Sequence, residues 1–293
     1  MGTDPEEVKL PRDAAYWASQ VETLRVSRVP TGAINLNVEG RQVVGPLQGF
    51  GQLWERTYRV RLPGLALTAV EVMEIWKKNF PTFMPPGQRF YPVMGKLEPG
   101  QLILINASVG MPVSTGVMVL YADDESFTLM TPQGHPESGW NTFSVSRADD
   151  GCIICQIQSL ARANDPLYEL GFRLMGASIQ EKIWVHVLTK LAERFHVNGV
   201  VQSYKTCLDP RLQWSEARNI WQNAAIRTML YMLCAPLRLL FPVRLLRRIP
   251  PDTVLVVRQE SSKVEVITSS SDEGESELQA TASPVEKDEP EEG

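Results

Sequence analysis

One long amphipathic helix constrains the fold more than any other feature of this sequence. From Ser178 to Phe195 apolar residues recur every three or four positions, and polar residues occupy the other side. Ser178 and Glu181 form a capping box, which predicts that the helix begins at Ser178. Because a helix with a continuous apolar stripe has to cover an apolar surface, the rest of the chain must supply that surface.

The chain before this helix reads as a series of strands. Residues 53–62 alternate apolar and polar side chains, with Arg56 as the exception on the apolar face. Further strands are predicted to begin at Gln101, Thr115, Ser126, Asn141 and Cys152. The pair Asp150-Gly151 is a hairpin signal between the last two, so neighbouring strands are expected to be antiparallel.

Shorter helices are predicted around these strands. Residues 14–26 place apolar side chains at helical spacing, which predicts an N-terminal helix. Thr68 and Glu71 form a capping box before a helix that ends at a proline cluster. Asp165 followed by proline caps a short helix that ends near Gly171. The predicted order is therefore strand, helix, antiparallel strands and long helix.

This order, together with two segments of sequence, resembles a known superfamily. Residues 76–92 read WKKNFPTFMPPGQRFYP, and residues 127–176 read FTLMTPQGHPESGWNTFSVSRADDGCIICQIQSLARANDPLYELGFRLMG. Over residues 53–199 the chain resembles the START and pollen-allergen (SRPBCC) superfamily, and within it an uncharacterised, mainly bacterial branch. The resemblance implies an α+β helix-grip fold, in which a curved antiparallel sheet wraps around a long C-terminal helix.

The resemblance also implies a hydrophobic cavity for lipid-like or polycyclic ligands, with cyclase or dehydratase chemistry in some members. The inward positions of the predicted strands are apolar, which suits a cavity lining and a filled core alike. The expected ligand-binding residues are Tyr58, Ile103, Ile105, Val117, Val119, Phe127, Leu129, Phe143, Cys155 and Ile157. We therefore expect a binding protein for an apolar small molecule or lipid. A cyclase or dehydratase-type enzyme using the same cavity and an interaction domain with a filled core are the alternatives.

Candidate catalytic residues are few. His135 and Glu137 lie in the loop GHPESGW, where a base and an acid at a strand end can move protons. The glycines and the proline of that loop favour a tight turn instead. Cys152 and Cys155 are three residues apart on a strand, so their thiols face opposite sides and make no metal site. We predict neither a metal nor a cofactor.

Charge is distributed unevenly along a chain whose net charge is -5. We divide the sequence into an N-terminal helix with an irregular lead-in (1–50), the helix-grip domain (51–200), an Arg-rich amphipathic helical extension (201–250) and a final segment (251–293). That final segment combines a short strand-like stretch with an acidic tail that is expected to be disordered. The acidic N-terminus lacks the features of a secretory signal, so a cytoplasmic location is expected.

The Arg-rich extension is too interrupted by arginine and proline to cross a membrane. It is amphipathic, so it either lies on an anionic membrane surface, at the inner face of the membrane, or packs across the domain. The expected membrane-surface residues are Arg218, Trp221, Arg227, Tyr231, Arg238, Phe241, Arg244, Arg247 and Arg248. No nucleic-acid partner is expected, because the main domain has no basic patch with stacking aromatic residues.

Overall fold

The computed structural model of the protein describes residues 14–108 and 111–240. The chain divides into a unit of residues Met1–Pro236 and a second unit of residues Leu237–Gly293. All the strands and all the sites described below belong to the first unit. The strand-like segment and the acidic tail predicted for residues 251–293 lie outside the described residues.

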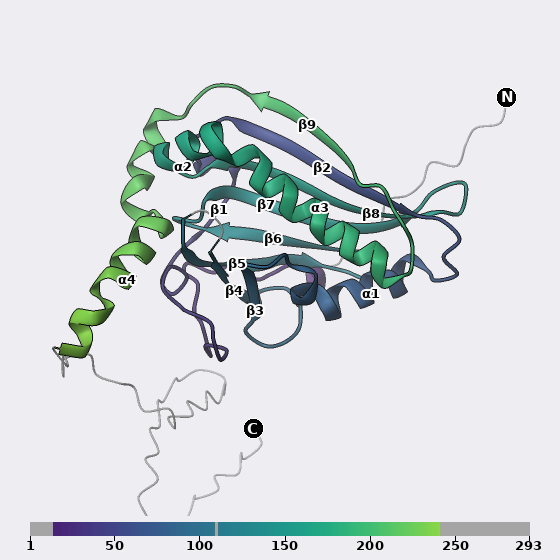
Figure 1. The fold of residues 1–293 in the computed structure, drawn as a ribbon, viewed down its shortest axis with the longest axis horizontal. Helices are drawn as coiled ribbons and strands as arrows, with labels where there is room; N and C mark the ends of the chain where they lie inside the picture. Colours follow the sequence, from purple (N-terminus) through teal and green to yellow (C-terminus); the bar gives the residue numbers. More distant parts are fainter. Residues whose placement is uncertain (1–13, 109–110, 241–293) are drawn as a thin grey trace, which may run out of the picture. The chain divides into compact units, whose positions relative to one another are not determined.

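An antiparallel sheet of nine strands forms the body of the first unit (Figure 1). Its strands are β1 (Val43–Val44), β2 (Leu53–Leu62), β3 (Gln88–Pro92), β4 (Leu102–Ala107), β5 (Val113–Ala122), β6 (Ser126–Pro132), β7 (Glu137–Arg147), β8 (Ile153–Ala163) and β9 (Gln202–Asp209). The order across the sheet is β3-β4-β5-β6-β7-β8-β2-β9, and β1 pairs with β6. The predicted strands are therefore present, and the connections between neighbours are antiparallel as expected.

The long helix and the helix that follows β2 pack on one face of this sheet. The helical segments are η1 (Ala14–Tyr16), η2 (Pro46–Gln48), α1 (Ala69–Asn79), η3 (Phe80–Phe83), α2 (Pro166–Gly171), η4 (Phe172–Gly176), α3 (Ala177–Arg194), η5 (Trp214–Gln222) and α4 (Ala224–Leu240). The capping box of α1 forms as predicted, because the Thr68 hydroxyl accepts from Glu71 N and the Glu71 carboxylate accepts from Thr68 N. The long helix α3 lies across the inner face of β2, β7 and β8 (Figure 1).

The core lies between this inner face and helices α1 and α3. Tyr58, Val60 and Leu62 of β2 are at most 2% exposed, so the predicted alternation of that strand is confirmed. From α3 the apolar residues Val187 and Leu188 pack into the same core. The predicted α+β helix-grip arrangement is confirmed in the described residues, with α3 as the gripped helix.

The predicted N-terminal helix over residues 14–26 is wrong. Only a single 3-10 turn forms, at Ala14–Tyr16, and the chain then runs without helical hydrogen bonds. Trp17 packs edge-on against Tyr121 of β5 with ring centroids 4.8 Å apart, and Ala18 N donates to Leu120 O. Pairing with β5 at Trp17 and Ala18 uses backbone groups that a helix would have bonded internally.

Two local predictions around α3 also need correction. Ser178 lies inside α3, which begins at Ala177, because the backbone continues from α2 through the π-helical turn η4 without a break. The hairpin between β7 and β8 forms, but its loop is longer than two residues, since Ala148 N donates to Cys152 O. Gly151 takes φ +78° in that loop, a conformation that favours glycine.

Strand β9 was not predicted, because residues 201–250 were expected to form a helical extension, and it makes α3 an internal element. β9 pairs with β2 from Leu53↔Asp209 to Arg59↔Gln202. The guanidinium of Arg162, only 2% exposed, donates to Gly51 O at 2.7 Å, to Arg211 O at 3.0 Å and to Asp209 Oδ2 at 2.7 Å. One buried arginine therefore joins the segment after β9 to the start of β2.

Candidate functional site

The apolar end of the space between the sheet and α3 is occupied by aromatic side chains. Phe127 and Phe143 stack with centroids 4.5 Å apart, and Trp76, Phe80 and Trp184 meet Phe143 edge to face at 5.2–5.7 Å. The ten predicted ligand-binding residues all belong to this core and are at most 6% exposed: Tyr58, Ile103, Ile105, Val117, Val119, Phe127, Leu129, Phe143, Cys155 and Ile157. Their inward orientation is what the alternation predicts, and their role in binding stays a prediction.

The other end of the inner face is polar. Arg56 of β2 is paired with Ser159 of β8, and Ser159 is paired with Asn141 of β7. Directly opposed residues of neighbouring strands share a face, so these three side chains form a row across the sheet. All three are buried, at 7%, 0% and 8% exposure respectively. We call Arg56, Glu137, Asn141, Ser159 and Gln180 the polar cluster.

A hydrogen-bond network connects the polar cluster to α3. Arg56 Nη1 donates to Glu137 Oε1 at 3.2 Å and to Gln180 Oε1 at 2.7 Å. Gln180 Nε2 in turn donates to Glu137 Oε2 at 2.7 Å and to Ser159 Oγ at 3.4 Å. The side chains of Arg56 and Glu137 are 8% and 11% exposed, so their ion pair is buried. Burial raises the pKa of Glu137, and the charge of Arg56 opposes that rise.

Two polar atoms of the cluster, Arg56 Nε and Asn141 Oδ1, are buried without a hydrogen-bond partner among the described residues. The indole nitrogens of Trp76 and Trp184 in the adjoining core are also buried without a hydrogen-bond partner among the described residues. A buried polar group without a partner costs about 1–3 kcal/mol, so native proteins pair such groups with protein, water or ligand. The cluster can therefore accept further polar partners.

Near the cluster, the sheet ends at the exposed strand β9. Lys205 Nζ lies 4.2 Å from the ring centroid of Trp54, and Arg56 Cζ lies 5.9 Å from it. Burial lowers the pKa of Lys205, and the charge of Arg56 adds to that effect. Ser203 Oγ donates to Glu181 Oε1 at 3.1 Å, which ties the first turns of α3 to β9. This corner of the site therefore brings together charges of both signs, from Lys205, Arg56 and Glu181.

The predicted catalytic pair meets through the main chain. His135 Nδ1 lies 3.1 Å from Glu137 N and accepts its hydrogen bond, while the Glu137 carboxylate faces Arg56. Burial lowers the pKa of His135 to about 4, so the imidazole is neutral near pH 7. Its main-chain bond holds the turn that Gly134, at φ +85°, makes possible. A proton-transfer role for His135 and Glu137 stays a prediction.

Reasoning from the sequence missed Arg56, Gln180, Ser159 and Asn141. The available signal was Arg56, the one charged residue on the apolar face of its strand. A charge at an inward position needs a buried partner, and that requirement points to a polar site. Gln180 carried no comparable signal, because it falls on the polar side of the helical pattern.

The predicted membrane-surface residues are distributed over η5, α4 and the chain beyond. Trp221 of η5 is 84% exposed, Arg218 and Arg227 are exposed, and Tyr231 is half-buried. Arg238 lies in α4, whereas Phe241, Arg244, Arg247 and Arg248 lie outside the described residues. Within residues 14–108 and 111–240, none of the helices combines the length and the apolar character that crossing a membrane requires.

Comparison with protein families gives one match. Residues 69–190 match the model of a family described as a domain of unknown function (DUF1990). This segment runs from the first residue of α1 into α3, so it includes Glu137, Asn141, Ser159 and Gln180. No curated protein matches the chain.

Solved structures similar to this chain include proteins of the superfamily that the sequence resembles. A START superfamily protein from Mycobacterium smegmatis is 15% identical, with a TM-score of 0.36, over 50% of this chain and 99% of its own. A conserved protein from Geobacillus kaustophilus is 11% identical, with a TM-score of 0.38, over 50% of this chain and 99% of its own. Truncated norcoclaurine synthase from Thalictrum flavum is 9% identical, with a TM-score of 0.37, over 50% of this chain and 95% of its own. Likeness at this level says nothing about what the chain binds.

Proposed function

We propose that this domain binds a small amphipathic molecule, such as a lipid, between the sheet and α3. The observation that carries the proposal is the pair of buried atoms, Arg56 Nε and Asn141 Oδ1, without partners among the described residues. Two strand spacings separate Arg56 from Asn141, a distance of about 10 Å. A polar head group of a few atoms bridges that distance, and the apolar part of the ligand lies against the aromatic residues.

The start of α3 is the entry route in this proposal. The π-helical turn η4 immediately precedes α3, and π-turns within helices are frequent at functional sites. Four side-chain hydrogen bonds hold the first turns of α3 to the sheet, three of them made by Gln180 and one by Glu181. Release of these bonds exposes the polar cluster while Val187 and Leu188 stay in the core.

The test is native mass spectrometry of the gently purified full chain and of Asn141→Leu. Leucine has the same branching and the same number of side-chain heavy atoms as asparagine and removes an unpaired acceptor, so this variant should keep its stability and lose the bound mass. The matched control is Thr142→Val, the next residue, which pairs with Thr128 on the opposite face of the sheet. If no apolar molecule accompanies the wild-type chain, or if Asn141→Leu keeps it at equal occupancy, the proposal fails and the filled-core interaction domain is favoured.

We propose further that α4 docks on an anionic membrane surface from the cytoplasmic side. In the described part of α4, Met229, Leu230, Met232 and Leu233 are 41–68% exposed, and Arg227 is exposed on the same helix. Exposed apolar residues beside cations are typical of helices that lie at the interface of an anionic bilayer. A single exposed apolar residue would need no explanation, but four within five positions of one helix do.

Flotation with vesicles of phosphatidylglycerol and phosphatidylcholine tests this docking. The wild-type chain should float with the vesicles, and Leu230→Glu/Leu233→Glu should stay at the bottom of the gradient. Val200→Glu, at a position that is 83% exposed outside the helix, is the control and should float. Equal flotation of the double variant and the wild type would reject docking through α4.

A further inference from the structure

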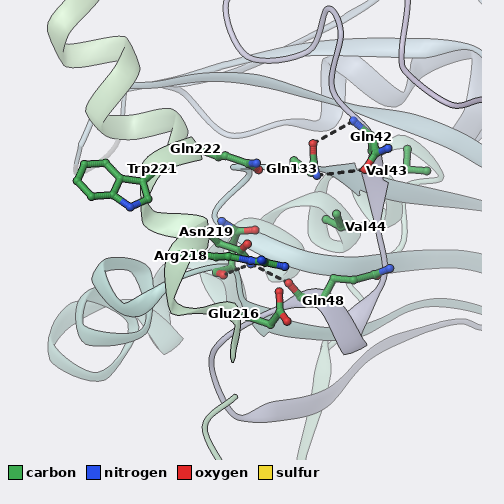
Figure 2. A pocket seen from close by; sticks show the side chains of 11 residues that line it. Gln42, Val43, Val44, Gln48, Gln133, Glu216, Arg218, Asn219, Trp221 and Gln222 are labelled. Atoms are coloured by element: carbon green, nitrogen blue, oxygen red, sulfur yellow. Dashed lines mark hydrogen bonds between the residues drawn. The ribbon is translucent and has the colours of Figure 1, made fainter. Parts of the chain in front are cut away.

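A second site lies outside the space between the sheet and α3. A cavity of about 510 Å³ opens between the β1–η2 segment and η5 (Figure 2). It is lined by Gln42, Val43, Val44, Gln48, Gln133, Asn164, Glu216, Arg218, Asn219, Trp221 and Gln222. None of these belongs to the polar cluster. Its volume falls within the range of small-molecule sites, but its lining is mostly polar where such sites are usually apolar.

Hydrogen bonds hold the walls of this cavity in place. Asn219 Nδ2 donates to Gln48 O at 2.8 Å and to Asn164 O at 3.0 Å, which joins η5 to both facing segments. Gln133 Nε2 donates to Gln42 Oε1 at 3.3 Å, and Gln42 N donates to Gln133 Oε1 at 3.4 Å (Figure 2). These contacts fix the cavity without using its charged side chains, so the site is preorganised.

Three polar side chains of the lining remain available. Among the described residues, Glu216, Arg218 and Gln222 make no side-chain hydrogen bond and no ion pair. Figure 2 shows Glu216 and Arg218 extending from η5 toward the Gln48 segment, whereas Trp221 points away. The cavity therefore offers a carboxylate acceptor, a guanidinium donor and an amide that does both.

The charges of these groups select the ligand. Glu216 and Arg218 cancel, so the lining carries no net charge and gives no advantage to an anion or a cation. A hydroxyl group accepts from a guanidinium and donates to a carboxylate, so one ligand with several hydroxyls pairs with all three side chains. We propose that this cavity binds a neutral polyhydroxylated molecule of the size of a mono- or disaccharide.

Isothermal titration calorimetry with trehalose and glucose tests the proposal on the full chain. At least one of these probes should bind, and Glu216→Ala and Arg218→Ala should each weaken binding about tenfold or more, because each removes a hydrogen bond to a charged group. Both side chains lack a protein partner among the described residues, so the variants should melt at the wild-type temperature. The control is Glu22→Ala/Arg25→Ala, which removes the same two residue types from a different cavity and should bind as the wild type does.

Three results would overturn the inference. The first is that neither sugar binds at millimolar concentration. The second is that inorganic phosphate or glutamine binds more tightly than the sugars. The third is that Glu216→Ala and Arg218→Ala leave the affinity for sugar unchanged. The inference is independent of the proposed ligand between sheet and helix. Asn141→Leu should therefore lose the co-purified apolar mass and keep the affinity for sugar.

Discussion

Replacing Arg56 by methionine should lower the free energy of unfolding by about 3 kcal/mol. Arg56 Nη1 makes two hydrogen bonds, to Glu137 and Gln180, and bonds of this charged kind contribute about 1.5–3 kcal/mol each. The substitution also removes the unpaired Nε atom, which returns about 1 kcal/mol. Gln180 continues to donate to Glu137, so the loss should lie at the low end of the range for a broken buried ion pair.

Urea unfolding followed by circular dichroism and tryptophan fluorescence measures this loss. The free energy of unfolding of the double variant Arg56→Met/Glu137→Leu should lie within about 1 kcal/mol of the wild-type value, because replacing both members of a buried pair leaves no charge uncompensated. Arg59→Met, at an exposed position on the outer face of the same strand, is the control and should change stability by less than about 0.5 kcal/mol. If Arg56→Met costs less than about 1 kcal/mol, the network is solvated and the polar cluster is no interior site.

Three other predictions concern single side chains. The pKa of His135 is lowered from 6.5 to about 4, so between these two pH values the unfolded chain binds more protons than the folded one, and the free energy of unfolding should fall as the pH drops. His135→Asn should reduce the slope of this fall by up to about 1.4 kcal/mol per pH unit. An unchanged pH dependence in thermal melts would contradict this. Asp165 caps α2 and accepts from Asn223 at 2.9 Å, so Asp165→Ala should cost about 2 kcal/mol in urea unfolding, whereas Asp165→Asn keeps the cap and should cost less than half as much. Burial raises the pKa of Cys155, so iodoacetamide should modify the exposed Cys234 and leave Cys155 unmodified in the native protein, as peptide mass spectrometry would show.

The parts of the fold that follow from neighbouring residues could be predicted from the sequence. The alternation of residues 53–62 and the capping box at Thr68 each depend on contacts within one strand or one helical turn. Residues 14–26 show the limit of such reasoning. Their apolar residues do recur at helical spacing, but contacts with β5 determine the conformation. No residue pattern near this segment predicts those contacts.

The polar cluster could not be assembled from the sequence because its members are far apart in the chain. Arg56 is 81 residues from Glu137 and 124 residues from Gln180. The charge of Arg56 on an apolar face indicates that it has buried partners, but it does not indicate which residues they are. The cavity beside η5 was missed for a similar reason, because it joins segments near Gln48, Gln133 and Asn219 that show no shared pattern.

The place of β2 in the sheet has a consequence for how the protein is made. β2 ends at Leu62, but its partner β8 begins at Ile153 and its other partner β9 begins at Gln202. A ribosome adds about 5–20 residues per second, so β2 waits on the order of 5–20 s for its first neighbour, with both edges open to other nascent chains. The arginines at positions 56, 59 and 61 then keep the waiting strand soluble.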